Sequence, residues 1–383
     1  MRVTYLSCRL TPSGGTKIIA QHVNLLNERG HDAQILTLDG KQDQLWGTPV
    51  ARVKAFNQDL LGGADILVAT WLRDVETASK IKGPAVCHFC QGYEPTELSF
   101  RIRGEDIPTK YRFWGRLGRL LFLRKKWSFR RRIRAIERIY RLPTFKIAIS
   151  YALKEIVENH YGGNCRYVPN GIDSHLFSPP SQPISFRMPL RLLSVGPNNV
   201  VIRGVEDTFR AVQIVKGKNI PVEFIRVSQS EFGESERRGG LVDRFLVGLD
   251  EREMADLYRN GHFLIAPSLW GAIGLPAVEA MSCGVPCILT ATGKHRSLDP
   301  AMDFAYFVPP HSPEAIAEGI IKIRDDPALR NRIVRRGFEV ARQYTLKNMG
   351  DRLEEALSGI LEEWKRPKPP ETGNADRWRA NDR

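Results

Sequence analysis

Two rounds of one pattern run through this sequence: a short apolar run, a loop with glycine, and a stretch with apolar residues every three or four positions. The apolar runs read as strands and the periodic stretches as helices. In the first round, the expected strands are residues 2–8, 33–38, 64–69, 85–89 and 146–150. Strands that alternate with helices form parallel sheets covered by helices on both faces. The chain is therefore expected to be an α/β protein.

The alternation pauses at residues 169–189, where five prolines interrupt the chain as in a linker. It then resumes, so we expect two doubly wound, Rossmann-like domains at 1–168 and 190–344, which suits a length of 383 residues. A helix at 345–364 is expected to pack back on the first domain, and the polar, proline-rich tail at 365–383 to be disordered. The predicted ligand site is the cleft between the domains, where the carboxyl ends of the strands converge.

Composition excludes several other classes. Apolar residues make up 42% and charged residues 26%, which is the range of globular proteins and not of disordered chains. Cys87 and Cys90 form a CxxC pair without a second pair to complete a zinc site, and six cysteines are too few for a disulfide framework. No signal-like segment precedes the strand at the start, and the longest charge-free stretch, 261–278, is short and contains two prolines. We expect a soluble, cytoplasmic chain.

A glycine turn follows the first strand and opens the first helix. It contains Gly14 and Gly15 after Ser13. Free backbone N–H groups at such a position can hold an anion or a sugar oxygen. The turn lacks the spacing of a P-loop or of a dinucleotide-binding fingerprint. A plain tight turn explains it equally well.

A second glycine-rich loop is more informative. Gly274-Leu275-Pro276 leads into a helix whose first turn is expected to carry Glu279. A carboxylate there can accept two hydrogen bonds from a vicinal diol such as that of ribose. The alternative is a helix-start glutamate that complements the helix dipole. Chemistry alone does not choose between the two.

The string from Ala266 to Pro286 resembles the signature of family-4 glycosyltransferases, whose usual form is Pro-Ser-x-x-Glu-Gly-Phe-Gly-Leu-Pro-x-x-Glu-Ala-Met. These are retaining enzymes of the GT-B fold, which has two Rossmann-like domains that face a central cleft. Further matches follow in order along almost the whole chain: Gly14-Gly15, Glu28 to His31, Ser150 to Lys154, Val168 to Asp173, and Ser194 to Gly196. The resemblance implies the GT-B fold for this chain.

The resemblance also implies an activity: retaining transfer of a sugar from a nucleoside-diphosphate donor, by a hexosyl- or deoxyhexosyltransferase, with no bound metal and no other cofactor. The expected acceptor is a lipid-linked or cell-envelope glycan. By the same resemblance, Arg203 pairs with the diphosphate where the family has lysine, and Glu279 binds the ribose hydroxyls; these two are the predicted catalytic residues, with Lys294 or Arg296 as further leaving-group cations. The predicted donor-binding residues are Gly196, Asn198, Arg203, Gly271, Gly274, Leu275 and Glu279.

Three positions depart from the family pattern. Gly271 stands where the first glutamate of the signature belongs, and Pro197 follows Gly196 where the family has arginine. Where the family often has His-Asp, either Gln91 replaces the histidine, or His88 is simply buried in its strand. The predicted acceptor-side residues are Gly14, Gly15, His88 and Gln91. A catalytically degenerate binding or partner protein is the alternative function.

Positive charge is concentrated in one segment. The chain has a formal net charge of +14, of which +12 lies in residues 101–141. Aromatic and aliphatic residues recur there at helical spacing, as in an interfacial anchor on anionic lipid. The alternative is a core-packing helix with a solvated basic face; nucleic-acid binding has no module motif to support it and is not expected. We expect a peripheral protein on the inner face of the plasma membrane, held by Trp114, Arg124, Lys125, Lys126, Trp127, Arg130 and Arg131.

Overall fold

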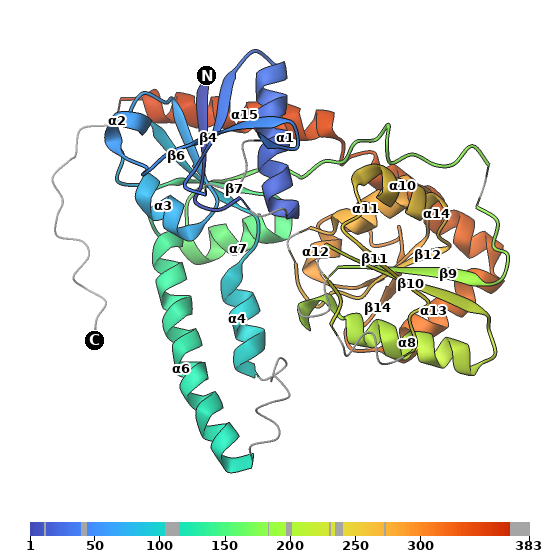
Figure 1. The fold of residues 1–383 in the computed structure, drawn as a ribbon. Helices are drawn as coiled ribbons and strands as arrows, with labels where there is room; N and C mark the ends of the chain where they lie inside the picture. Colours follow the sequence, from blue (N-terminus) through green and yellow to red (C-terminus); the bar gives the residue numbers. More distant parts are fainter. Residues whose placement is uncertain are drawn as a thin grey trace.

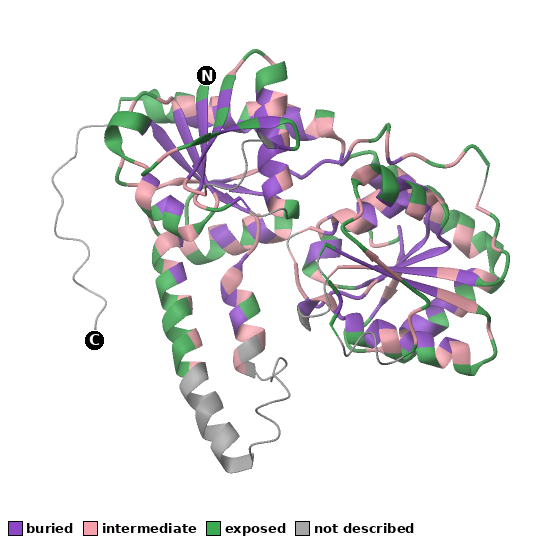
Figure 2. Ribbon diagram, in the orientation of Figure 1, coloured by how far each residue is buried: buried purple, intermediate pink, exposed green. Residues whose placement is uncertain are grey.

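Two α/β domains make up the protein, each built on a mainly parallel sheet with helices on its faces (Figure 1). The structure, a computed structural model, describes residues 1–10, 13–39, 44–103, 115–182, 184–196, 201–229, 231–233, 240–271 and 273–367. Buried residues concentrate in the strands of both sheets and on the helix faces that cover them (Figure 2). This arrangement is the predicted GT-B architecture.

The first sheet has eight strands among the described residues, in the order β3-β4-β2-β1-β5-β6-β7-β8. Only β3 and β4 pair antiparallel, and the other neighbours are parallel. The strands are β1 (Arg2–Ser7), β2 (Asp32–Thr37), β3 (Gln44–Leu45), β4 (Thr48–Arg52), β5 (Ile66–Ala69), β6 (Ala85–Cys90), β7 (Phe145–Ala148) and β8 (Cys165–Tyr167). Central strands such as β5 and β6 are buried throughout, as expected where helices cover both faces.

Six helices accompany this sheet among the described residues: α1 (Gly14–Glu28), α2 (Gln58–Leu61), α3 (Leu72–Ala78), α4 (Glu94–Arg103), α6 (Gly115–Tyr140) and α7 (Tyr151–Tyr161). Helix α1 begins where Ser13 accepts a hydrogen bond from the Thr16 N–H, and its buried face includes Ile18, Ile19 and Val23. Helix α6 extends well away from the sheet, with α4 beside it (Figure 1).

The second sheet has six parallel strands among the described residues, in the order β11-β10-β9-β12-β13-β14. They are β9 (Leu190–Val195), β10 (Val222–Ser228), β11 (Arg244–Val247), β12 (Phe263–Ala266), β13 (Cys287–Thr290) and β14 (Tyr306–Val308). The accompanying helices are η1 (Val201–Arg203), α8 (Val205–Gly217), α10 (Glu251–Arg259), α11 (Leu275–Ser282), α12 (Gly293–Arg296), α13 (Pro313–Asp325) and α14 (Pro327–Ala341). After β9, the strands β10 and β11 are added on one side of it, and the next strand in the chain, β12, pairs with its other side. The crevice beyond β9 and β12 is therefore the topological switch point, where such sheets bind ligands.

The chain crosses between the domains twice, and the two crossings touch. Ile172 forms an isolated parallel bridge with Thr345, and a Cβ on Gly171 would lie 2.4 Å from the Thr345 carbonyl oxygen. The last helix, α15 (Leu346–Lys365), then returns to the first domain, where Leu353 and Ile360 join its core. Arg29 fixes this helix through ion pairs with Asp351 and Glu354. The predicted disordered tail lies outside the described residues from residue 368 on.

The six cysteines carry free thiols, and all but Cys8 are buried. No described helix combines the length and the apolar character that a bilayer-spanning segment needs.

Candidate active site

The glycine turn of the first domain lies at the start of α1, and Gln91 lies against it. A Cβ on Gly15 would meet the Gln91 side-chain oxygen at 2.9 Å, so any larger residue would displace that amide. Gly14 is exposed, and its hypothetical Cβ meets no atom within 4 Å. As the first residues of α1, both carry N–H groups without an intrahelical acceptor. The structure thus brings three of the predicted acceptor-side residues together.

The fourth, His88, is not available to a ligand. Its side chain is 2% exposed and lies in β6 against the Tyr140 ring, with ring centroids 4.7 Å apart. Burial, with a smaller contribution from Lys146, lowers the pKa of His88 to about 3, so the imidazole is neutral. Of the two readings of this region, the buried-strand reading describes His88 in this structure, which does not place its side chain with Gly15 and Gln91.

Arg203 lies at the switch point of the second domain, on η1. The Leu269 N–H donates to the Ile202 carbonyl at 2.8 Å, which ties η1 to the loop after β12. Gly204 follows with a left-handed φ of +66°, and a Cβ there would lie 2.0 Å from the Pro267 carbonyl oxygen. Only glycine permits this close approach. The docking of η1 therefore fixes where Arg203 stands.

The Arg203 guanidinium is largely desolvated. Burial lowers its pKa, and the nearby Glu97 of α4 opposes that shift from across the cleft. Its Nε is buried and has no hydrogen-bond partner among the described residues. Buried polar groups are normally hydrogen-bonded, so a largely desolvated guanidinium whose Nε has no acceptor is suited to binding an anion.

Lys294 on α12 is a buried cation beside the partly buried Arg203. Its side chain is 3% exposed, and its Nζ donates to Ser268 Oγ at 3.0 Å. Burial, and then the neighbouring Arg203 charge, lower the pKa of Lys294 to about 7. Within the described residues neither cation has a carboxylate in ion-pair range. Arg296, the other candidate cation, is exposed and lies elsewhere, as described below.

The glycine-rich loop after β12 closes over Lys294. Cβ atoms on Gly271 and Gly274 would lie 2.9 Å from the Lys294 Cδ and 3.0 Å from its Cε. Gly274 and Leu275 begin α11, so their N–H groups have no intrahelical acceptor. Gly196 follows the end of β9 and has a φ of +123°, and the Arg226 guanidinium donates to its carbonyl at 2.7 Å. Asn198 lies outside the described residues.

Glu279 lies in the second turn of α11, not in the first as expected, because the helix begins at Leu275. At that depth the helix dipole gives it little stabilisation, which weakens the dipole explanation. Its Oε2 accepts a hydrogen bond from the Tyr258 hydroxyl at 3.1 Å. Burial raises the pKa of Glu279, and Lys17 of the first domain partly offsets this.

Contacts across the cleft hold the two domains together on this side. Lys17, in the first turn of α1, forms an ion pair with Glu251, in the first turn of α10. Trp270, Ile273 and Leu275 of the second domain pack against the hydrophobic core of the first. The glycine turn of α1 and the loop after β12 therefore face each other across one site.

The basic helix α6 packs on the first domain through its apolar residues. Ile136 and Tyr140 are buried, and Phe129 and Ile133 are partly buried against the same core. These four residues pack on the core, as the alternative interpretation of the basic segment expected, so they do not form an apolar face that is free to contact lipid. The exposed side carries Trp127, 66% exposed, with Arg130 and Arg131, and Arg131 lies over the Trp127 ring. The Lys126 side chain is partly exposed. Trp114 and the side chains of Arg124 and Lys125 lie outside what the structure describes.

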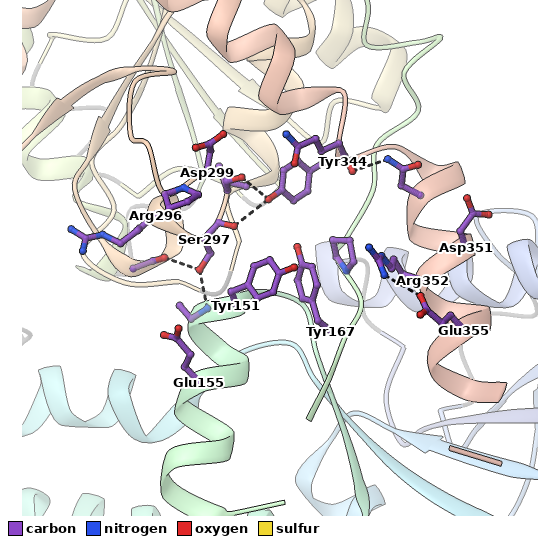
Figure 3. Close-up of a pocket in the computed structure, with 17 residues that line it drawn as sticks. Tyr151, Glu155, Tyr167, Arg296, Ser297, Asp299, Tyr344, Asp351, Arg352 and Glu355 are labelled. Carbon is purple, nitrogen blue, oxygen red and sulfur yellow. Dashed lines mark hydrogen bonds and ion pairs between the residues drawn. The ribbon is translucent and has the colours of Figure 1, made fainter. Parts of the chain in front are cut away.

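A separate pocket of about 850 Å³ lies at the hinge, lined by α7, the two crossings, α12 and α15 (Figure 3). The Tyr151 and Tyr167 rings stack in it with centroids 4.0 Å apart. The Ala152 N–H donates to Ser297 Oγ at 2.9 Å and joins α7 to α12. Arg296 lines this pocket and not the site of Arg203 and Lys294. None of the predicted donor-binding residues lines it.

Several residues of the site were not singled out from the sequence as ligands or as the groups that position them. Ser268 is the serine of the glycosyltransferase signature but was given no role, and Lys17 and Arg226 stand in none of the matched family motifs. The partner of each lies at least 26 residues away in the chain. Gly204 gave the one usable signal, since a glycine directly after a candidate cation suits a left-handed turn. Among the described residues, no three His, Cys, Asp or Glu side chains lie close enough together to hold a metal ion.

The architecture and the site define a two-domain protein of the GT-B type, and comparisons with known proteins agree. Residues 243–340, in the second domain, match the family described as "Glycosyl transferases group 1", in agreement with the resemblance drawn from the motifs of that domain. A phosphatidyl-myo-inositol mannosyltransferase of Mycobacterium leprae (strain TN) is 24% identical over 204 residues, or 52% of this chain and 54% of that protein. The chain thus spans about half the length of this curated relative.

Solved structures share the fold over nearly the whole chain. Sucrose-phosphate synthase from Thermosynechococcus elongatus superposes with a TM-score of 0.70 at 15% identity, covering 94% of this chain and 99% of that one. Anabaena HepE, solved in complex with UDP and glucose, gives 0.69 at 16% identity, covering 94% and 100%. The GT-B fold expected from the sequence is confirmed.

Proposed function

We propose that this chain is a glycosyltransferase that moves a sugar from a nucleoside-diphosphate donor to a lipid-linked or cell-envelope glycan, with retention of the anomeric configuration. The observation that carries the proposal is the largely desolvated Arg203 at the switch point, whose buried Nε has no hydrogen-bond partner among the described residues. The match of the second domain to group 1 glycosyltransferases supports it. So does the fold shared with HepE, whose structure holds UDP and glucose.

In the proposed reaction the bond between the sugar and the diphosphate breaks as the acceptor hydroxyl attacks from the same face, and the proton of that hydroxyl passes to the departing phosphate oxygen. Negative charge then develops on the leaving diphosphate, where Arg203 and the N–H groups at the start of α11 would stabilise it. Glu279 would hold the ribose hydroxyls, with its carboxylate oriented by Tyr258. Closure of the two domains, with the Lys17–Glu251 pair at the rim, would exclude water and limit hydrolysis of the donor.

The test begins with nucleotide-sugar donors screened by thermal shift, followed by release of nucleoside diphosphate with and without acceptor. The Arg203→Met variant should bind the selected donor about ten- to hundredfold more weakly, since a charge-assisted hydrogen bond contributes about 1.5–3 kcal/mol. Arg203→Lys is the matched control and should retain most of the affinity. Unchanged affinity in Arg203→Met would refute the site assignment. EDTA should leave turnover unchanged, since we propose a metal-independent reaction.

The same assay separates the alternative function. A degenerate binding protein would bind the donor, lose affinity in Arg203→Met, and yet release no nucleoside diphosphate with any acceptor. The degenerate binding protein is tested because Gly271 replaces the first glutamate of the signature.

We also propose that the protein is peripheral on the inner face of the plasma membrane. The support is the exposed side of α6, where Trp127, Arg130 and Arg131 lie together on a helix that extends away from the sheet (Figure 1). Arginines near an anionic surface contribute about 1 kcal/mol each, and an exposed tryptophan suits the interface. The acceptor-binding domain would then face the membrane that carries a lipid-linked acceptor.

A further inference from the structure

The cation on α12 has no structural partner that accounts for it. Lys294 is 3% exposed, and its only described hydrogen-bond partner is the neutral Ser268 hydroxyl. Arg203 lies near enough for its charge to act on it. A buried cation beside a partly buried and largely desolvated one, with no carboxylate in ion-pair range of either among the described residues, is costly to the protein without a ligand. Such an arrangement is expected where a ligand supplies the missing negative charge.

The loop after β12 is shaped around this lysine. A Cβ on Gly271 would lie 2.9 Å from the Lys294 Cδ and 3.7 Å from its Nζ, and one on Gly274 would lie 3.0 Å from its Cε. Gly271 has no left-handed φ that would by itself require glycine. The lysine therefore takes the space that any side chain at position 271 would need. The residue at 271 and the residue at 294 form a complementary pair.

We propose that Lys294 is a second ligand for the anionic group of the donor, beside Arg203, and that Gly271 is the residue that makes room for it. The inference rests on the proposed function and adds a specificity-determining pair to it. The oxyanion that the two cations suit is the diphosphate, which would place one negative phosphate near each cation. A carboxylate on the donor sugar offers the same chemistry, and the experiment below separates the two sources.

Lys294 also gives the site a measurable proton linkage. Near pH 7 part of the lysine is neutral in the free protein, and a bound oxyanion favours the charged form, so binding takes up a proton. The groups that face Lys294 do not change protonation near pH 7. Arg203 stays protonated, and His295 on the same helix stays neutral because its pKa is about 3. The negative charge of Glu97 lies near Arg203 and opposes the lowering of its pKa. Tyr151 and Glu155 of α7 line the hinge pocket together with residues of α12.

The test measures binding of inorganic pyrophosphate, UDP and GDP by calorimetry to wild type, Lys294→Met and Lys294→Arg. Lys294→Met should bind at least one of these probes about ten- to hundredfold more weakly. Its thermal stability without ligand should be equal to or above that of wild type, because a buried charge has been removed. Between pH 6 and 9 the wild-type affinity should fall more steeply with rising pH than that of Lys294→Arg, which stays charged. Lys294→Arg is the reference because the phosphate itself titrates in this range.

A second variant keeps the charge and moves the side chain. Gly271→Ala should displace Lys294 and weaken pyrophosphate binding, whereas Gly284→Ala, at the other end of α11, should not. Glucuronate is tested in parallel: if Lys294→Met loses glucuronate and keeps pyrophosphate, the cation binds a sugar carboxylate. Equal affinities of wild type and Lys294→Met for all four probes would overturn the inference and leave the proposed function standing if the nucleotide binds. Failure of wild type to bind any probe would instead overturn the donor site itself.

Discussion

Replacing Gly204 by alanine tests how the fold positions Arg203. The residue has a φ of +66°, and an added Cβ would lie 2.0 Å from the Pro267 carbonyl oxygen. A left-handed conformation costs a non-glycine residue about 1–2 kcal/mol. Relieving the contact requires the backbone of η1 or of the loop after β12 to move by about 1 Å or more, which as overpacking costs about another 1–3 kcal/mol. The expected destabilisation of the second domain is thus about 2–5 kcal/mol.

Gly284→Ala is the matched control, because its φ is +78° and the nearest atom to its Cβ would be Pro179 Cβ at 4.0 Å. It should cost only the left-handed term, about 1–2 kcal/mol. Hydrogen exchange of peptides from η1, α8 and α11 measures the local stability, since a two-domain chain need not unfold in one step. Donor affinity is measured in parallel and should fall in Gly204→Ala only, because the shift moves Arg203. If the two variants are equal in local stability and in donor affinity, the reasoning about η1 is wrong.

Two further predictions concern the ribose and the membrane. Glu279→Gln should reduce the preference for a ribonucleotide over its 2′,3′-dideoxy analogue. Because burial raises the pKa of Glu279, lowering the pH should reduce that preference at a higher pH than for an ordinary glutamate. If the ratio of the two affinities is unchanged in Glu279→Gln, the residue has a structural role alone. For the membrane, Arg130→Ala with Arg131→Ala should weaken binding to anionic vesicles roughly 30-fold, from about 1 kcal/mol per arginine, and salt should weaken wild-type binding. Arg332→Ala with Arg335→Ala, two exposed positions in the other domain, is the control. Equal binding to neutral vesicles would contradict the electrostatic part.

The regular part of the fold was predictable because local patterns decide it. Apolar runs and helical periodicity gave the two parallel sheets, and Ser13 before the glycine turn marked the start of α1. The short elements were missed, because β3 with two residues and α2 with four are too brief for periodicity to detect. Local contacts define both: Asn57 caps α2, and β3 pairs with β4 across the two-residue turn at Trp46 and Gly47.

The site was predictable only in pieces. Motifs located Arg203, Gly274 and Glu279, and Lys294 was one of two candidate leaving-group cations, but the sequence could not choose between it and Arg296. In the structure Lys294 lies beside Arg203, 91 residues earlier in the chain. That proximity depends on the order β9-β12-β13, because Arg203 follows β9 and Lys294 follows β13. Periodicity along α6 likewise could not tell an apolar face buried on a domain from one free for lipid. His88 had the same ambiguity until the packing of Tyr140 resolved it.

The central claim is that a nucleoside-diphosphate donor is held at the switch point of the second domain. A crystal structure of the protein with the nucleoside diphosphate selected by the donor screen tests it most directly. We expect diphosphate oxygens within hydrogen-bond distance of Arg203 and of the α11 N-terminus, and ribose hydroxyls at Glu279. A nucleotide bound instead in the hinge pocket beside Tyr151 and Arg296, with the switch point empty, would contradict the account.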